Sequence, residues 1–441
     1  MSISNMNRRD FLKGCGAAAA ASVAGTGMFF ATPAQAAVSN DTIVHVFLRG
    51  GIDGLNLVVP IAGADRGFYE EARPDLQIAV SGSYAALPLA LASGAQTGFG
   101  LHPSATGLRD LWVDSKLAIV QSCGMPTTVT RSHFDAQLYL DLGTPGLVGT
   151  GTGWITRAWA AQAGQAAQLP VLAVNSRQPN NMLGSTAALS MGTPSDFSLN
   201  RGAWAWQKWR DGMPVGTKGL NETLASLWNG SSQLEGDGRR ADAALRLIAS
   251  KTYADLPASW PTSDFARQLW VVAQTIRFGM GLRYAAVDLG GWDTHEGQGT
   301  AGSGYHYYQN RIAELSQALT AFYVEMAAGG EASRVTVVVQ SEFGRRVREN
   351  ASGGTDHGYG NPMLVLGGTV KGRRMLGTWS GLNPEILSPH FGDIPANTDF
   401  RQVLSELLIR RLGNHQLSSI FPGYSGYAPL NIVHGTDITP V

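Results

Sequence analysis

Short apolar runs alternate with amphipathic stretches along the chain, and this alternation predicts its elements. The apolar runs are predicted strands at Thr42–Leu48, Lys116–Ser122, Pro170–Asn175, Tyr284–Leu289, Arg334–Gln340 and Pro362–Leu366. The amphipathic stretches are predicted helices at Arg131–Leu142, Ala158–Gln165, Arg239–Lys251, Ser263–Gly279, 306–328 and Asp399–Leu412. Strands that alternate with helices predict an α/β fold with a mainly parallel sheet, covered by helices on both faces.

The stretch 176–236 departs from this pattern. It is rich in Gly, Asn, Trp and Ser and its periodicity is weak. We interpret it as an insertion or cap over the functional site rather than as an independent domain. The remainder of 37–441 is then a single α/β domain.

The first 36 residues have the features of an export signal. Arg8-Arg9 is followed by Phe11-Leu12-Lys13, then by an Ala/Gly-rich stretch from 14 to 31, and Ala34-Gln35-Ala36 is a small-x-small cleavage site. The order resembles a twin-arginine signal, which bacteria use for proteins exported already folded. An uncleaved membrane anchor is the alternative, but the run is short and Gly-rich for a span. We expect a periplasmic or secreted protein with no stable membrane span after signal cleavage.

Composition narrows the classes of function. The formal net charge is +0, so no basic surface indicates nucleic-acid binding. Of the two cysteines, Cys15 lies in the signal. Cys123 then remains alone and is predicted to be a small buried residue rather than a nucleophile.

Carboxylates and imidazoles follow several of the predicted strands. They lie in RGGIDGLN (49–56), LGGWDTHEG (289–297), SEFGRR (341–346) and GGTDHGYGN (353–361). Ligands of parallel α/β sheets bind beyond the carboxyl ends of the strands. These side chains therefore predict a site for a divalent metal such as zinc or manganese. The candidate ligands are Asp53, Asp293, His295, Glu342, Asp356 and His357.

Each candidate also has a structural interpretation. Asp53 suits a turn that binds its own backbone, and Asp293 suits an Asx-turn beside a surface His295. Glu342 ends a buried strand, where Arg345 or Arg346 would compensate its charge as well as a metal would. Asp356 either binds metal itself or orients another ligand, and its loop is otherwise a solvated one.

A second group precedes the predicted helix at 131–142. The Ser132 hydroxyl lies where the positive helix N-terminus favours an alkoxide nucleophile, although a Ser N-cap fits the same position. His133 is a candidate to bind an anionic group or a metal, and Arg131 is a candidate anion clamp. Ser132, His133 and Arg131 are the predicted catalytic residues.

The motifs RGGxDGLN, RSHF, GGWDTH, SEFGRR and GTDHG, behind a twin-arginine signal, together resemble the DUF1501 family. That resemblance implies a relation to the alkaline phosphatase/sulfatase superfamily, and so an α/β/α sandwich with one or two metal ions (Zn, Mn or Ca) at the carboxyl edge of the sheet. It implies Asp53 as a first-strand metal ligand and Ser132, with Thr130 behind it, as the nucleophile. Where the superfamily has adjacent Asp and His at a strand end, this chain has Glu342-Phe343, and Asp356-His357-Gly358 matches either that signature or the last His.

The expected function is hydrolysis of a phosphate or sulfate ester by an exported metal-dependent enzyme. Its substrate would be a small anionic ester or a sulfated or phosphorylated glycan. The alternative is a non-catalytic metal- or glycan-binding envelope protein, which the departure at Glu342 and the aromatic residues Trp204, Trp206, Trp209 and Trp228 favour. A serine hydrolase of the lipase type is disfavoured because the chain has no G-x-S-x-G elbow.

Overall fold

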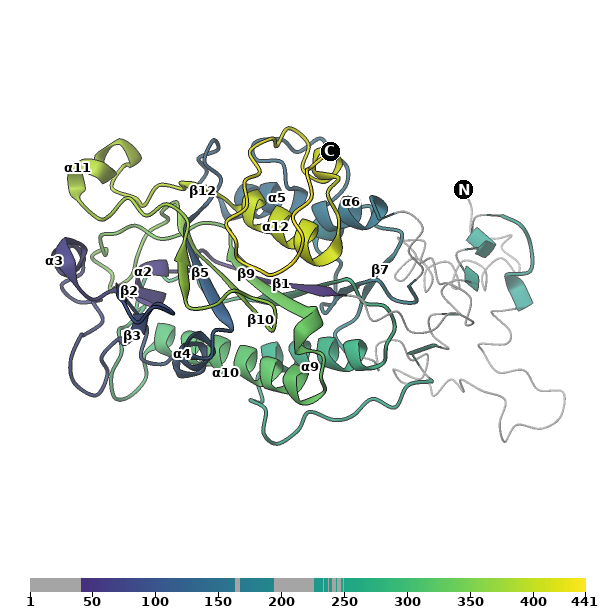
Figure 1. Cartoon of the computed structure of the whole chain (residues 1–441), viewed down its shortest axis with the longest axis horizontal. Coiled ribbons are helices and arrows are strands. Elements are labelled where there is room, and N and C mark those ends of the chain that lie inside the picture. Colours follow the sequence, from purple (N-terminus) through teal and green to yellow (C-terminus); the bar gives the residue numbers. More distant parts are fainter. Residues whose placement is uncertain are drawn as a thin grey trace, which may run out of the picture.

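A nine-stranded sheet forms the centre of the part of the chain that the structure describes (Figure 1). The computed structural model describes residues 41–162, 167–193, 226–232, 234–236, 238–239, 243, 247–248 and 250–441. The strands of the sheet are β1 (Thr42–Leu48), β5 (Leu117–Gly124), β6 (Val171–Ala173), β7 (Ala188–Ser190), β8 (Tyr284–Leu289), β9 (Val335–Ser341), β10 (Asn361–Gly367), β11 (Arg374–Leu376) and β12 (Thr398–Asp399). Their order is β11-β5-β10-β9-β1-β8-β6-β7, and β12 pairs with β5.

The sheet is mainly parallel, and β10 is its antiparallel member. β10 runs antiparallel to both of its neighbours, β5 and β9, while the other pairings of this sheet are parallel. The carboxyl ends of β1, β5, β8 and β9 therefore meet at one edge, together with the amino end of β10. The segments that follow or precede these strands contain the residues predicted for the site.

Helices cover both faces of the sheet (Figure 1). α4 (Thr106–Val113), α9 (Asp264–Arg277) and α10 (Tyr307–Ala328) lie on one face, and α5 (His133–Leu142), α6 (Trp154–Ala160) and α12 (Phe400–Leu412) lie on the other. Side chains of β1 alternate between the two cores: Val44 and Val46 belong to the first, and Ile43 and Phe47 to the second. This alternation explains why the strand is apolar at nearly every position.

Smaller elements complete the described chain. A three-stranded antiparallel sheet is built from β2 (Val58–Pro60), β3 (Leu87–Ala90) and β4 (Gln96–Leu101). The short helices are α2 (Gly54–Leu57), α3 (Gly63–Ala72), α11 (Pro384–Leu387) and α13 (Leu417–Ile420), with 3-10 turns η2 (Asn180–Met182), η4 (Ala332–Arg334) and η5 (Ser388–His390). Among the described helices, none has both the length and the apolar character needed to cross a bilayer.

The predicted α/β class and mainly parallel sheet are confirmed, with three corrections. α6 begins at Trp154 and ends at Ala160, earlier than the helix predicted from 158 to 165. The stretch 176–236 is not all insertion, because β7 pairs with β6 and extends the main sheet. Between residues 54 and 113 the structure has a small sheet and helices for which the sequence pattern gave no prediction. Residues 194–225, and much of the helix predicted from 239 to 251, lie outside the described residues.

Candidate metal centre

Three histidines, one from the start of α5 and two from the loops after β8 and before β10, converge on one carboxylate oxygen. The Nε2 atoms of His133, His295 and His357 lie 3.3, 3.2 and 3.3 Å from Oδ1 of Asp293. Ligand atoms of His133, Asp293 and His357 all lie within 4.8 Å of one another, close enough to share a metal ion. His295 adjoins this group, since its Nε2 lies 2.8 Å from Nε2 of His357.

The other ring nitrogen of each histidine faces an oxygen. Nδ1 of His133 lies 2.8 Å from the Glu342 carboxylate, Nδ1 of His357 lies 2.6 Å from the Arg131 carbonyl, and Nδ1 of His295 lies 3.2 Å from the Asp356 carboxylate. Carbonyl and ionised carboxylate oxygens only accept hydrogen bonds, so Nδ1 of each ring carries the proton. A neutral ring then presents a lone pair at Nε2.

This tautomer assignment leaves the centre of the group electron-rich. Lone pairs of His295 and His357 face each other, and all three rings face the Asp293 carboxylate. Nε2 of His133 is buried and has no hydrogen-bond partner. Such an arrangement is repulsive unless a cation or an additional proton lies among the Nε2 atoms. Burial lowers the pKa of His133, but the Glu342 and Asp293 carboxylates outweigh burial and raise this pKa. Histidines oriented by a carboxylate or carbonyl at the other nitrogen are also typical of metal ligands. The residues present therefore fit a divalent metal.

Asp293 itself is fixed by a buried arginine. Nη2 of Arg345 lies 2.6 Å from Asp293 Oδ1. Burial alone would raise the pKa of Asp293, but the hydrogen bond and charge of Arg345 outweigh burial and lower this pKa to about 2. Asp293 is therefore ionised at every pH at which the protein is expected to work.

Two glycines allow the loops to approach. A Cβ on Gly50 would lie 2.4 Å from the backbone nitrogen of Asp293, and one on Gly354 would lie 2.4 Å from the backbone carbonyl of His295. Gly50 also has a φ of 122°, which disfavours other residues. The loop after β8 is held between these two glycine-containing segments.

Glu342 lies beside the group and orients it. Its Oε1 accepts hydrogen bonds from the Gly50 backbone at 2.8 Å and from Gln137 at 2.9 Å, in addition to its contact with His133, and Oε2 accepts from Ser341 at 2.8 Å. Burial opposes ionisation, but the bonds from His133 and Gln137 outweigh it and lower the pKa of Glu342. The structure thus corrects both interpretations of this residue: it pairs with neither Arg345 nor Arg346, and it fixes a histidine instead of joining the metal ligands.

Asp356 has the orienting position that was one of its two predicted roles. Its Oδ1 lies 3.2 Å from His295 Nδ1 and accepts a hydrogen bond of 3.0 Å from Asn350. The pKa of Asp356 is lowered, and the hydrogen bond from Asn350 makes the largest contribution to this shift. Asp356 therefore keeps a negative charge next to His295.

Asp53 is engaged elsewhere, which corrects its assignment as a metal ligand. Its two carboxylate oxygens accept from Arg73 at 2.6 and 2.9 Å, and Gln298 donates a further bond of 2.6 Å. Asp53, Arg73 and Gln298 are fully buried. We leave Asp53 out of the proposed metal centre because this ion pair already saturates its carboxylate.

The predicted catalytic residues separate into different roles. His133 is part of the histidine group. Ser132 is the N-cap of α5, and its side chain accepts from the Asp135 backbone at 3.3 Å. The Arg131 carbonyl holds His357, while its guanidinium pairs with the buried Asp393, to which Arg346 also extends at 3.8 Å.

Several contributors were missing from the sequence prediction. Gln137 follows His133 by four residues on α5, a spacing that places both on one helix face and that was available as a signal. Arg73 and Asp393 lie in segments with no motif. Only the folded chain brings them to Asp53 and Arg131.

A second buried polar group lies behind the histidines. Arg49 pairs with Asp288 at 3.0 Å and donates to Gln137 at 2.9 Å, which connects it with Glu342. Asp141 is buried in the same region. Burial, joined by the charges of Asp288 and Glu342, raises the pKa of Asp141 to about 7 against the opposing effect of Arg49.

The fold and the histidine group together define an α/β protein with a candidate metal centre at the carboxyl edge of its sheet. Residues 244–391 match the family described as "Protein of unknown function (DUF1501)", about a third of the chain, and this segment contains Asp293, His295, Glu342, Asp356 and His357. Residues 5–25 match the twin-arginine translocation pathway signal sequence. The predicted DUF1501 resemblance is confirmed for that segment, and the prediction of twin-arginine export is confirmed as well. No curated protein matches the chain.

The placement of Asp53 generates a prediction about stability. Asp53→Asn leaves a buried guanidinium with a neutral partner, so we expect the free energy of unfolding to fall by about 3–5 kcal/mol. The exposed Asp75→Asn is the matched control and should change it by less than about 0.5 kcal/mol. Urea denaturation followed by tryptophan fluorescence measures both. Loss of bound metal from Asp53→Asn with unchanged stability would restore Asp53 as a ligand.

The pKa of Asp141 generates a pH prediction. Because its pKa in the folded chain is about 7 and the ordinary pKa of an aspartate is 3.8, the folded state holds this proton more tightly than the unfolded state. The stabilising contribution is complete below about pH 4 and is lost as pH rises toward 7. Relative to Asp141→Asn, the parent should therefore lose stability between about pH 4 and pH 7. Parallel stability–pH curves for the two proteins would contradict this assignment.

Proposed function

We propose that the protein is an exported metal-dependent hydrolase of an anionic ester, with one divalent cation held by His133, Asp293 and His357 and with His295 beside it. The observation that carries the proposal is the convergence of three Nε2 atoms on Asp293 Oδ1, with every Nδ1 already facing an oxygen. Among the described residues, this is the cluster of ligating side chains that approaches closely enough for a metal.

The donor set favours zinc. Imidazole nitrogens and a carboxylate suit zinc, and three protein ligands would leave its fourth position to water, whereas Ca²⁺ takes six to eight oxygen ligands. The Asp293 side chain is 50% exposed and that of His295 is 43% exposed. The centre therefore faces solvent, and both water and a substrate are able to reach it. When bound, such a metal lowers the pKa of a water molecule and polarises an ester oxygen.

An anionic substrate is supported by two arginines next to the centre. Arg131 and Arg346 share the carboxylate of Asp393, so the three side chains carry a net positive charge. The side chains of Arg131 and Arg346 are 36% and 39% exposed, while Asp393 is buried. Asp393 thus positions Arg131 and Arg346 for the phosphate or sulfate of the substrate.

Water, rather than Ser132, is the proposed nucleophile. The Ser132 hydroxyl already accepts from a helix backbone nitrogen, which is the ordinary role of serine at an N-cap. Glu342 and Asp356 keep His133 and His295 in the tautomer that directs Nε2 toward the centre. A relation to the alkaline phosphatase/sulfatase superfamily forms part of this proposal and is supported by a mainly parallel sheet with the centre at its carboxyl edge.

A non-catalytic metal-binding protein is the second candidate. The engagement of Ser132 as a cap favours it, since no other hydroxyl of the chain is assigned as a nucleophile. The tryptophans that suggested glycan binding do not decide the matter. Trp228 is buried, and Trp204, Trp206 and Trp209 lie outside the described residues.

Metal loading tests the centre. Signal-cleaved protein dialysed against Zn²⁺ should retain one ion per chain, measured by elemental analysis. Asp293→Ala and His357→Ala should lose it, and the exposed His434→Ala is the control that should keep it. Glu342→Gln should weaken zinc binding by about 10–100-fold, because it removes the partner that orients His133. Equal zinc content in all four variants would exclude the centre.

Turnover separates the two candidates. Zinc-loaded protein is assayed with aryl phosphates and aryl sulfates, and we expect hydrolysis that chelation abolishes. Ser132→Ala should keep most of this activity while losing about 0.5–2 kcal/mol of stability with its cap. A folded, zinc-loaded Ser132→Ala protein without activity would make Ser132 the nucleophile. Full zinc loading of the parent without turnover of any ester would favour the binding protein.

A further inference from the structure

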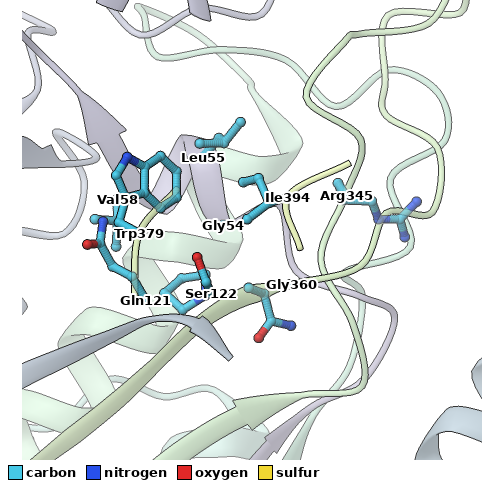
Figure 2. A pocket seen from close by; sticks show the side chains of 11 residues that line it. Gly54, Leu55, Val58, Gln121, Ser122, Arg345, Gly360, Trp379 and Ile394 are labelled. Atoms are coloured by element: carbon cyan, nitrogen blue, oxygen red, sulfur yellow. The ribbon is translucent and has the colours of Figure 1, made fainter. Parts of the chain in front are cut away.

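Among the described residues there is also a cavity that Arg345 helps to line. Figure 2 shows it between the segment after β1, the end of β5 and the start of β10. Its free space is about 350 Å³ when the open mouth is counted, but only about 20 Å³ of it is enclosed. The enclosed part therefore takes one or two non-hydrogen atoms, such as the polar end of a ligand whose remainder lies in the mouth.

Two buried polar atoms of its lining have no hydrogen-bond partner. They are Oγ of Ser122 and Nδ2 of Asn361. The two residues are only 2% and 3% exposed. Buried polar groups are nearly always hydrogen-bonded in native proteins, so an unpaired pair in one cavity indicates a missing partner.

The backbone at Ser122 has a strained conformation, and the Ser122 hydroxyl lies on the side of the cavity. Ser122 has a φ of 53°, in the left-handed region that disfavours a serine within a strand. The register between β5 and β10 shifts at the same place, between Asn361 and Met363. In Figure 2 the Ser122 oxygen points into the cavity. Local strain of this kind is concentrated at functional sites.

The remaining walls carry no free charge. Leu55, Val58, Trp379 and Ile394 are apolar, and Gln121 contributes a neutral amide. Arg345 also lines the cavity, but its guanidinium points away from it in Figure 2 and is bonded to backbone carbonyls and to Asp293. A charged ligand would have no counter-ion here.

We propose that this cavity is a second binding site, for a small uncharged group that carries a hydroxyl or a carboxamide. Such a group both donates and accepts, so it pairs with Ser122 and with the Asn361 amide in either of its orientations. Its carbon atoms contact the apolar wall at Leu55, Val58 and Trp379. The site is formed without the histidines and does not depend on a metal.

Acetamide and acetate are matched probes, because they have nearly the same shape and differ in charge. The signal-cleaved protein is titrated with each, and binding is followed by saturation-transfer NMR. We expect saturable binding of acetamide that acetate does not displace. Ser122→Gly and Asn361→Leu should each weaken acetamide binding at least tenfold. Ser122→Gly should also melt at or above the temperature of the parent, because glycine tolerates the positive φ.

Two further measurements separate this site from the metal centre. Acetamide binding should be unchanged in the presence of a chelator and in His357→Ala, so that failure of the metal proposal leaves this one intact. The proposal is overturned by the absence of saturable acetamide binding in the parent, which would mean that the cavity holds water only. It is overturned equally by a Ser122→Gly protein that binds acetamide as the parent does.

Discussion

The guanidinium of Arg345 is the interaction on which the arrangement of the site depends. It is fully buried and donates to the carbonyls of Gly50, Gly51, Trp292 and Thr355 as well as to the Asp293 carboxylate. These partners belong to the loops after β1, after β8 and before β10. An arginine has five N–H donors in a rigid fork, so a single side chain is able to hold three loops at once. Within the part of the chain that the structure describes, Asp293 is the carboxylate that pairs with Arg345, and this pairing explains why it remains ionised beside three histidines.

Two buried arginines, Arg73 and Arg345, bind their aspartate partners in different ways. Arg73 occupies both oxygens of Asp53, and that pair joins the loop after β1 to α3 without offering any ligand atom to solvent. Arg345 binds one oxygen of Asp293 and leaves the side chain half exposed. A similar strand-end aspartate thus becomes structural in one loop and available to a cation in another. The two aspartates differ in how many of their carboxylate oxygens an arginine occupies: both in Asp53 and one in Asp293.

The sequence predicted which residues lie at the carboxyl edge of the sheet better than it predicted the role of each of these residues. The periodicity of apolar residues and the apolar runs identified the strands that meet at this edge. The sequence positions of His133, Asp293, His295 and His357, just after or before these strands, were enough to recognise them as site residues.

The role of a residue depends on the residues it contacts, and these come from distant segments of the chain. Asp53 could not be separated from Asp293 by its own motif, because Arg73 lies in a stretch without a signal. Glu342 was recognised as a buried carboxylate needing a partner, but its true partners, His133 and Gln137, lie about two hundred residues earlier. The antiparallel direction of β10 was not predicted either, since an apolar run does not encode its direction.

The histidine group draws on residues from 133 to 357, and such a group exists only when the chain has folded around the sheet. A protein that leaves by the twin-arginine route crosses the membrane after folding. The proposed cation site is therefore assembled while the chain is still in the cytoplasm. The ions present in that compartment have the first opportunity to fill it, before the protein meets those outside.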